Sequence, residues 1–208
     1  MKIGKWMALG LGMVFLAATC TAQDRPEVSS GSTKPGGLIT FRGNPLSLLG
    51  TPIAEGQRLP SVPLVDAIAM KEVDLSKEQG KVLFLSIVPS IDTPVCEVQT
   101  HYLGEEGDKL PDSVERITIS RDTPFAQKRF AKEAKLTDIR YLSDYKRGEF
   151  ARSTGLLIEG FELLGRAVIL VDEAGIVRYI QVVPELTELP DMETAFAEAV
   201  RLAGKEAK

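Results

Sequence analysis

The sequence predicts an α/β domain with a mixed central sheet that is flanked by helices and preceded by a β-hairpin. Three observations predict it: strand and helix patterns alternate through the middle of the chain, a hairpin and an amphipathic helix close it, and 44% of its 208 residues are hydrophobic while 26% are charged. Alternating strands and helices give parallel strand pairs, whereas hairpins add antiparallel ones. The composition is that of one ordinary globular domain, and neither an internal repeat nor a second domain is evident.

The first elements are a hairpin over 38–48, with Gly43-Asn44 as its turn, and a short strand near Leu64–Asp66 after a proline-containing loop. Val82–Val88 is a β-branched, apolar run, which predicts a buried strand. A stretch with helical spacing follows it and ends near Gly104. The later elements, in chain order, are a strand Val114–Ser120, a helix Phe125–Ala134, a strand Ile139–Leu142, a helix Arg147–Thr154, a hairpin of Arg166–Val171 with Ile176–Val183, and a helix Met192–Leu202. Phe125, Phe130 and Ala134 are expected to face the core.

The segment between the buried strand and the next helix carries the best candidate for chemistry. Thr93 is a good N-cap, and Pro94 suits the first helical position. Cys96 is then the third helical residue, where free N–H groups and the helix dipole favour a thiolate over a thiol. An arbitrary free cysteine is more often a small buried hydrophobe. The surrounding pattern, Pro-x-x-x-Thr-x-x-Cys from Pro89 to Cys96, favours a nucleophile instead.

This pattern resembles the peroxidatic motif of peroxiredoxins, and the fuller string Pro-Ser-Ile-Asp-Thr-x-Val-Cys resembles the thiol peroxidase (Tpx) subfamily. The segments 40–46, 119–130, 165–168 and 183–191 resemble other parts of the same subfamily in the same order. The resemblance therefore covers residues from about Leu38 to Ala203. It implies a thioredoxin-like fold and a thiol-dependent peroxidase that reduces hydrogen peroxide and small organic hydroperoxides without a cofactor or metal.

The resemblance also implies the roles of four residues. Cys96 would be the peroxidatic nucleophile that becomes a sulfenic acid. Thr93 would direct its hydroxyl at the sulfur and the peroxide, and Pro89 would shield the sulfur from water. Arg166 would stabilise negative charge in the transition state. Without the resemblance, Thr93 is a plain N-cap, and Arg166 is one half of a surface ion pair.

The chain departs from the subfamily at Ala131, where a resolving cysteine is usual. Alanine forms no disulfide, so we expect a one-cysteine cycle in which a thioredoxin-like protein or a small thiol reduces Cys96. Pro94, where glycine is common, is expected to be tolerated. The resemblance further implies a homodimer formed around the peroxidatic site. The alternative is an exported non-catalytic redox sensor or scaffold that retains the fold.

Other chemistries find little support in the sequence. His101 lies five residues after Cys96, about 140° away around a helix axis, and so does not face it. One cysteine and one histidine cannot fill a tetrahedral zinc site. A net charge of −4 and the absence of a basic run argue against nucleic-acid binding.

The N-terminus indicates export from a bacterial cytoplasm. Residues 1–19 combine lysines with an apolar run from Trp6 to Ala18 and are predicted to be a signal peptide. Cys20 follows small residues and is predicted to be lipidated, giving a periplasmic or cell-envelope lipoprotein. The competing interpretation is cleavage near Ala22. Residues 20–37, rich in Ser, Gly and Pro, are predicted to be a flexible tether, and residues 38–208 the domain.

Overall fold

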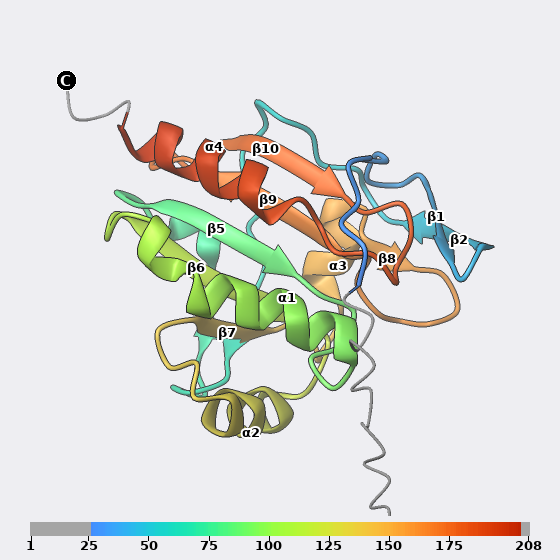
Figure 1. Cartoon of the computed structure of the whole chain (residues 1–208), viewed down its shortest axis with the longest axis horizontal. Helices are drawn as coiled ribbons and strands as arrows, with labels where there is room; N and C mark the ends of the chain where they lie inside the picture. The colour runs from blue at the N-terminus through green and yellow to red at the C-terminus, as the bar shows by residue number, and fades with distance from the viewer. Residues whose placement is uncertain (1–25, 205–208) are drawn as a thin grey trace, which may run out of the picture.

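A computed structural model of the chain describes residues 26–204. Within these residues a seven-stranded mixed sheet runs in the order β10-β9-β5-β6-β7-β3-β4 (Figure 1). β5 pairs in parallel with β6, and β6 with β7, while the other neighbours are antiparallel. The strands are β3 (Leu64–Asp66), β4 (Glu72–Val73), β5 (Val82–Ile87), β6 (Val114–Ser120), β7 (Arg140–Ser143), β9 (Ala167–Val171) and β10 (Val177–Val182). The predicted mixed α/β sheet is confirmed.

Two apolar layers lie on the two faces of this sheet. One face is covered by α1 (Pro94–Glu105), α2 (Pro124–Ala134) and α4 (Met192–Gly204), and Figure 1 shows α1 and α4 running in front of the sheet. The other face is covered by α3 (Glu149–Thr154) and a small second sheet. Every residue of β5 is buried, because this central strand has protein on both faces.

The second sheet contains the predicted N-terminal hairpin. β1 (Leu38–Phe41) pairs with β2 (Asn44–Leu49), which pairs with β8 (Leu157–Ile158). The turn is one residue earlier than predicted, because Asn44 pairs with Phe41 and leaves Arg42 and Gly43 as the turn residues. Both have positive φ, +52° and +78°, as a tight type I′ turn requires.

Residues 26–37 pack along the main domain, so the predicted flexible tether is wrong for this part of the chain. The amide of Ser29 donates to Leu189 O at 2.8 Å, and Thr33 N donates to Val182 O at 2.9 Å. The side-chain amide of Gln181 also donates to Ser29 O. The Ser- and Gly-rich composition of this segment predicts disorder. Its backbone nevertheless forms hydrogen bonds beside β10, which is an edge strand. Residues 20–25 lie outside the described residues.

Two local expectations are also corrected. Phe125 is 72% exposed, whereas Phe130 is buried, because residues five apart on a helix lie about 140° apart around its axis. The two-residue strands β4 and β8 were not predicted, since two residues are too few to show a hydrophobic period.

Candidate active site

The start of α1 has the local geometry that the sequence predicts. Thr93 occupies the N-cap in an extended conformation, Pro94 is the first helical residue, and Cys96 is the third. The Thr93 hydroxyl makes no capping hydrogen bond; it donates to Ser90 O at 3.1 Å. The helix therefore begins where expected, with the cysteine in its first turn.

The Cys96 thiol lies inside the protein against an arginine. Its residue is 0% exposed and belongs to the apolar layer beneath α1, α2 and α4. Nη2 of Arg166 lies 3.4 Å from the Cys96 Sγ. Reactive cysteines commonly occupy electropositive, partly exposed places. Here the electropositive neighbour is present, while the sulfur is covered.

Arg166 directly precedes β9 and is only 2% exposed. Its Nε and Nη2 both donate to Leu186 O, at 3.1 and 2.9 Å, and its Nη1 donates to Gln99 Oε1 at 2.8 Å. Burial lowers the pKa of Arg166 below its ordinary value, and the adjacent Cys96 sulfur opposes this shift. An arginine in a protein nevertheless stays cationic at neutral pH.

Within residues 26–204, no carboxylate contacts the Arg166 guanidinium. Among the described residues, the groups that contact the Arg166 guanidinium are the Leu186 carbonyl, the Gln99 amide and the Cys96 sulfur. A buried charge is costly unless an opposite charge neutralises it. The Cys96 thiolate is the one group in contact that can supply this charge. The predicted surface ion pair for Arg166 is therefore excluded.

Gln99 is a site residue that sequence reasoning missed. It is 0% exposed, and its Nε2 donates to Ser86 Oγ at 2.9 Å on β5, which fixes the orientation of the amide. The oxygen of the same amide then faces Arg166. Its spacing of three residues from Cys96 on a helix, where i and i+3 share a face, was the available signal.

Asp122 holds the loop before Cys96 and was also missed. Its carboxylate accepts from Ser90 Oγ at 2.7 Å and from Ile91 N at 2.8 Å. Pro89 is buried at the start of this loop, while Thr93 is exposed. The loop is therefore anchored from the segment between β6 and α2. The roles of Pro89 and Thr93 toward a peroxide stay predictions.

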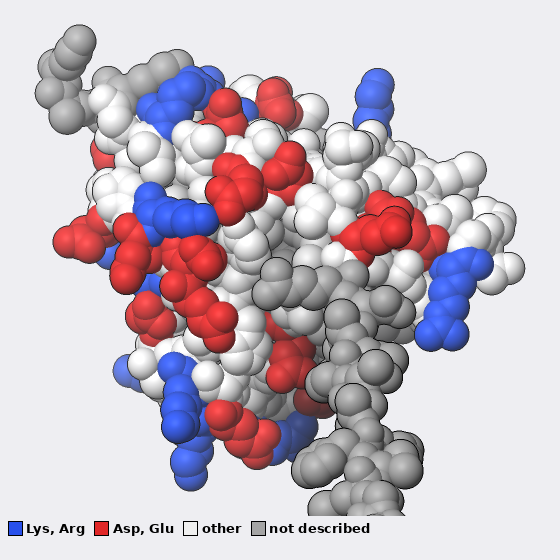
Figure 2. All heavy atoms as spheres, in the orientation of Figure 1, with Lys and Arg blue, Asp and Glu red and all other residues white. Residues whose placement is uncertain are grey.

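The other residues weighed from the sequence lie outside the site. His101 Nδ1 lies 2.8 Å from Glu105 Oε1 on the outer face of α1, as expected for a residue that does not face Cys96. Figure 2 shows acidic side chains gathered on the side of the molecule that α1 and α4 form. Arg129, on α2, pairs with Asp92 at 3.0 Å at the surface.

Ala131 lies on α2 and is 4% exposed, in the same apolar layer as Cys96. Cys96 is the free cysteine of the described residues. Cys20 lies outside them. Within residues 26–204, therefore, no second thiol is available to resolve a sulfenic acid.

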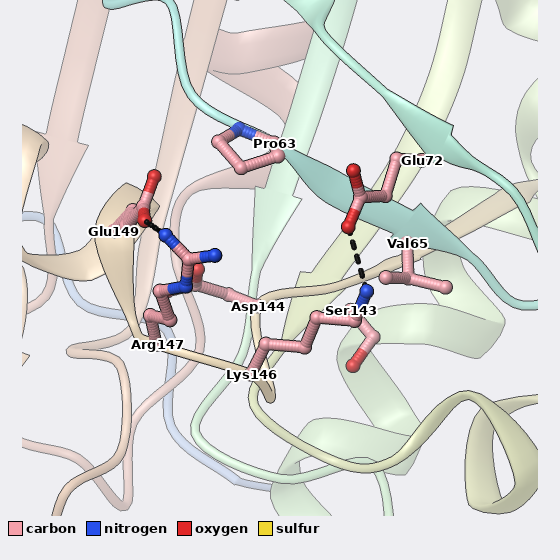
Figure 3. A pocket seen from close by; sticks show the side chains of 8 residues that line it. All are labelled: Pro63, Val65, Glu72, Ser143, Asp144, Lys146, Arg147 and Glu149. Atoms are coloured by element: carbon pink, nitrogen blue, oxygen red, sulfur yellow. Dashed lines mark hydrogen bonds and ion pairs between the residues drawn. The ribbon is translucent and has the colours of Figure 1, made fainter.

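A small cavity elsewhere does not take part in this site. It has a volume of about 60 Å³ and lies near β3, β4 and the loop after β7 (Figure 3). Four of its charged side chains form two pairs, Lys146 with Glu72 at 2.6 Å and Arg147 with Glu149 at 3.1 Å, and the Asp144 carboxylate accepts from backbone N–H groups of α3. It contains no nucleophilic thiol.

A sheet that presents a helix-start cysteine to a buried arginine defines a cysteine-dependent redox protein with a thioredoxin-like fold. The chain matches the family model described as Redoxin over residues 54–196. A thiol peroxidase of Halalkalibacterium halodurans is 42% identical over 161 residues, which are 77% of this chain and 96% of that protein. One of Staphylococcus saprophyticus is 39% identical over 157 residues, which are 76% and 94% of the two chains.

A solved structure agrees with these relatives. A peroxiredoxin-like protein from Aquifex aeolicus superposes with a TM-score of 0.75 at 31% identity, covering 80% of this chain and 97% of that one. The chain therefore belongs to the Redoxin family and, within it, to the thiol peroxidases of the peroxiredoxin superfamily.

The contact between Gln99 and Arg166 gives a first prediction. Gln99→Met should slow sulfenic acid formation on Cys96 about tenfold, because a buried guanidinium N–H that loses its acceptor lets the cation shift away from the sulfur. The rate is measured by rapid quenching with a sulfenic-acid trap and mass spectrometry.

The matched control is Gln127→Met. Gln127 is also 0% exposed, but it binds Ser120 Oγ and Leu142 O and does not contact Arg166. Both variants should lose stability, by ~1–3 kcal/mol. Equal rates in the two variants would contradict the assigned role of Gln99.

Proposed function

We propose that this protein is a thiol-dependent peroxidase that reduces hydrogen peroxide and small organic hydroperoxides through Cys96. The observation that carries the proposal is the buried Arg166 cation, whose contacts include the Cys96 sulfur and no carboxylate among the described residues. A structural cysteine in an apolar layer needs no such neighbour. A reactive thiolate, in contrast, needs a cation beside it that stabilises its negative charge.

The reaction is a displacement at oxygen. The Cys96 thiolate attacks one oxygen of the peroxide, so that an S–O bond forms while the O–O bond breaks. The departing oxygen takes up a proton and leaves as water or an alcohol, and the sulfur becomes a sulfenic acid. Because negative charge moves from sulfur to the departing oxygen, a cation close to both oxygens lowers the barrier. The contact of Arg166 with the Cys96 sulfur at 3.4 Å supports this role for it.

Thr93 can contribute as an acceptor. Its single hydroxyl proton already goes to Ser90 O, so its lone pairs are left for the O–H of a peroxide. Pro94, the first residue of α1, has no N–H, and Glu97 N already donates to Thr93 O, so the N–H groups of Val95 and Cys96 are the ones left as donors to the peroxide. The peroxide would thus be oriented by one acceptor and two backbone donors at the same helix end.

Turnover needs a thiol from outside the described domain, because Ala131 replaces the usual resolving cysteine. A thioredoxin-like protein or a small thiol attacks the sulfenic sulfur, expels water and forms a mixed disulfide. A second thiol then releases Cys96. Without prompt reduction, Cys96 proceeds to sulfinic acid.

A peroxide titration of the reduced mature protein tests both the activity and the cycle. We expect one sulfenic acid on Cys96, a Cys96 adduct when a small thiol is added, and overoxidation when it is omitted. Intact-mass analysis distinguishes these species, and Cys96→Ser is the control. Unchanged peroxide consumption by Cys96→Ser would refute Cys96 as the nucleophile, whereas no sulfenic acid on Cys96 of the parent would favour a non-catalytic sensor or scaffold. A disulfide between Cys96 and a second thiol of the protein, formed without added thiol, would refute the one-cysteine cycle alone.

Export with a lipid on Cys20 is part of the proposal. Residues 26–37 pack on the domain, so only about six residues connect Cys20 to the packed part, a reach of roughly 20 Å. A lipid anchor there would keep the domain close to the bilayer. Among residues 26–204, no helix has the length and apolarity needed to cross a membrane.

The anchor predicts a membrane-associated mature protein that begins at an acylated Cys20. Intact-mass analysis of the membrane fraction of the producing bacterium measures it, with Cys20→Ala as the matched control that should lose the lipid mass. A soluble mature protein that begins at Gln23 would refute the anchor and retain export. A mature protein that keeps Cys20 without a lipid would be a third case, in which Cys20 competes as an internal thiol for Cys96.

We also propose a homodimer that forms through the surface around the peroxidatic site. The outward side of α1 carries the half-buried Val98 and Tyr102, and Tyr145, in the loop after β7, is 38% exposed. Reduced protein should therefore sediment as a dimer at micromolar concentration, and Tyr145→Glu should weaken the association. A strict monomer at that concentration would overturn this expectation.

A further inference from the structure

One glutamate joins the N-terminal hairpin to the loop that holds the catalytic arginine. Glu185 lies in the loop between β10 and α4, and its two carboxylate oxygens accept five hydrogen bonds. The donors are Arg42 N at 3.0 Å, Gly43 N at 3.1 Å, Thr40 Oγ1 at 2.8 Å, Thr187 N at 3.1 Å and Thr187 Oγ1 at 2.9 Å. Three of these five donors belong to the hairpin, more than 140 residues earlier in the chain.

The carboxylate is held in its charged form. Burial by itself would raise the pKa of Glu185, but the donated hydrogen bonds outweigh it and hold the pKa at about 2. Hydrogen bonds to a charged acceptor are stronger than neutral ones. The connection therefore persists throughout the pH range in which a thiol peroxidase works.

The next residue in the chain contacts the catalytic cation. Leu186 O accepts two hydrogen bonds from Arg166, at 3.1 and 2.9 Å. The hairpin strand β1 also binds the loop on both sides of Glu185, since Thr40 N donates to Pro184 O at 2.7 Å and Leu186 N donates to Thr40 O at 2.9 Å. The position of the Leu186 carbonyl is thus set by the hairpin.

We infer that Glu185 is a positioning residue of the peroxidase reaction: it ties the hairpin turn to the 183–187 loop, which fixes the Leu186 carbonyl and, through it, the Arg166 guanidinium against the Cys96 sulfur. The inference rests on the proposed peroxidase function. Glu185 does not touch the sulfur, so it acts only through Arg166. By this inference the hairpin helps to position the catalytic arginine.

The turn residues fit this role through their backbone. Arg42 and Gly43 have positive φ, and both of their N–H groups point to the same carboxylate. Converging backbone N–H groups form a site for an anionic oxygen. The side chain of Arg42 is exposed and is not needed for the connection.

Glu185→Gln tests the inference, because it keeps the shape of the side chain but removes the charge and replaces one acceptor with a donor. We expect sulfenic acid formation on Cys96 to slow about tenfold. The matched control is Glu188→Gln in the same loop, where the side chain makes no hydrogen bond within the described residues, and its rate should stay within about twofold of the parent. Both are measured in the full mature chain.

A double-mutant cycle with Arg166→Lys separates positioning from a general loss of structure. Lysine keeps the charge but cannot reproduce the two bonds to Leu186 O. If Glu185 acts through Arg166, adding Glu185→Gln to Arg166→Lys should cause little further loss of rate. Fully multiplicative losses would overturn the inference. The pH profile of Cys96 alkylation should also shift in Glu185→Gln and remain unchanged in Glu188→Gln.

Thr40→Val is the second variant, for the case in which Glu185→Gln does not fold. It removes the contacts of the Thr40 hydroxyl with Glu185 and with Pro184 O and leaves the backbone pairing of the hairpin intact. Its rate should fall in the same direction by a smaller factor. A parent protein that forms no sulfenic acid would refute the proposed function, whereas a reactive parent with parent-like Glu185→Gln and Thr40→Val would refute only this inference.

Discussion

The cation of Arg166 is the constraint on which this end of the structure depends. A guanidinium that is 2% exposed must have its N–H groups satisfied and its charge balanced. Leu186 O and the Gln99 amide satisfy N–H groups but carry no charge. The balance falls to the Cys96 sulfur at 3.4 Å. The same requirement therefore explains why the 183–187 loop, α1 and Cys96 converge on Arg166.

The order of strands brings these groups together. Cys96 follows β5 and Arg166 precedes β9, and the two strands are antiparallel neighbours in which Ile87 pairs with Ala167. The end of β5 and the start of β9 therefore lie at the same end of the sheet, although 70 residues separate Cys96 from Arg166. The segment before α2 reaches the same end of the sheet, where Asp122 binds Ser90 and Ile91 in the loop before Cys96. The site is thus assembled from parts that the sheet aligns.

The contacts around Cys96 and the position of the usual resolving cysteine lie in different parts of the molecule. Arg166 contacts both Cys96 and Gln99, and neither contact involves Ala131. Ala131 fills an apolar position on α2, where a small side chain packs without a polar partner. Alanine at that position therefore leaves the contacts of Arg166 with Cys96 and Gln99 intact.

The sequence by itself determined the mixed sheet, nearly all of its elements and the place of Cys96 in the first turn of α1, because these follow from local patterns of hydrophobicity and from the Thr93-Pro94 helix start. It reached Arg166 only through family resemblance, since spacing carries no information on a contact 70 residues away. Tertiary structure alone decided that Arg166 is buried without a carboxylate, that Gln99 and Leu186 hold it, and that Glu185 ties the hairpin to them. It also decided that residues 26–37 are ordered. Their composition is typical of tethers, but their backbone forms hydrogen bonds beside an edge strand. The partners of these hydrogen bonds exist only once the sheet has formed.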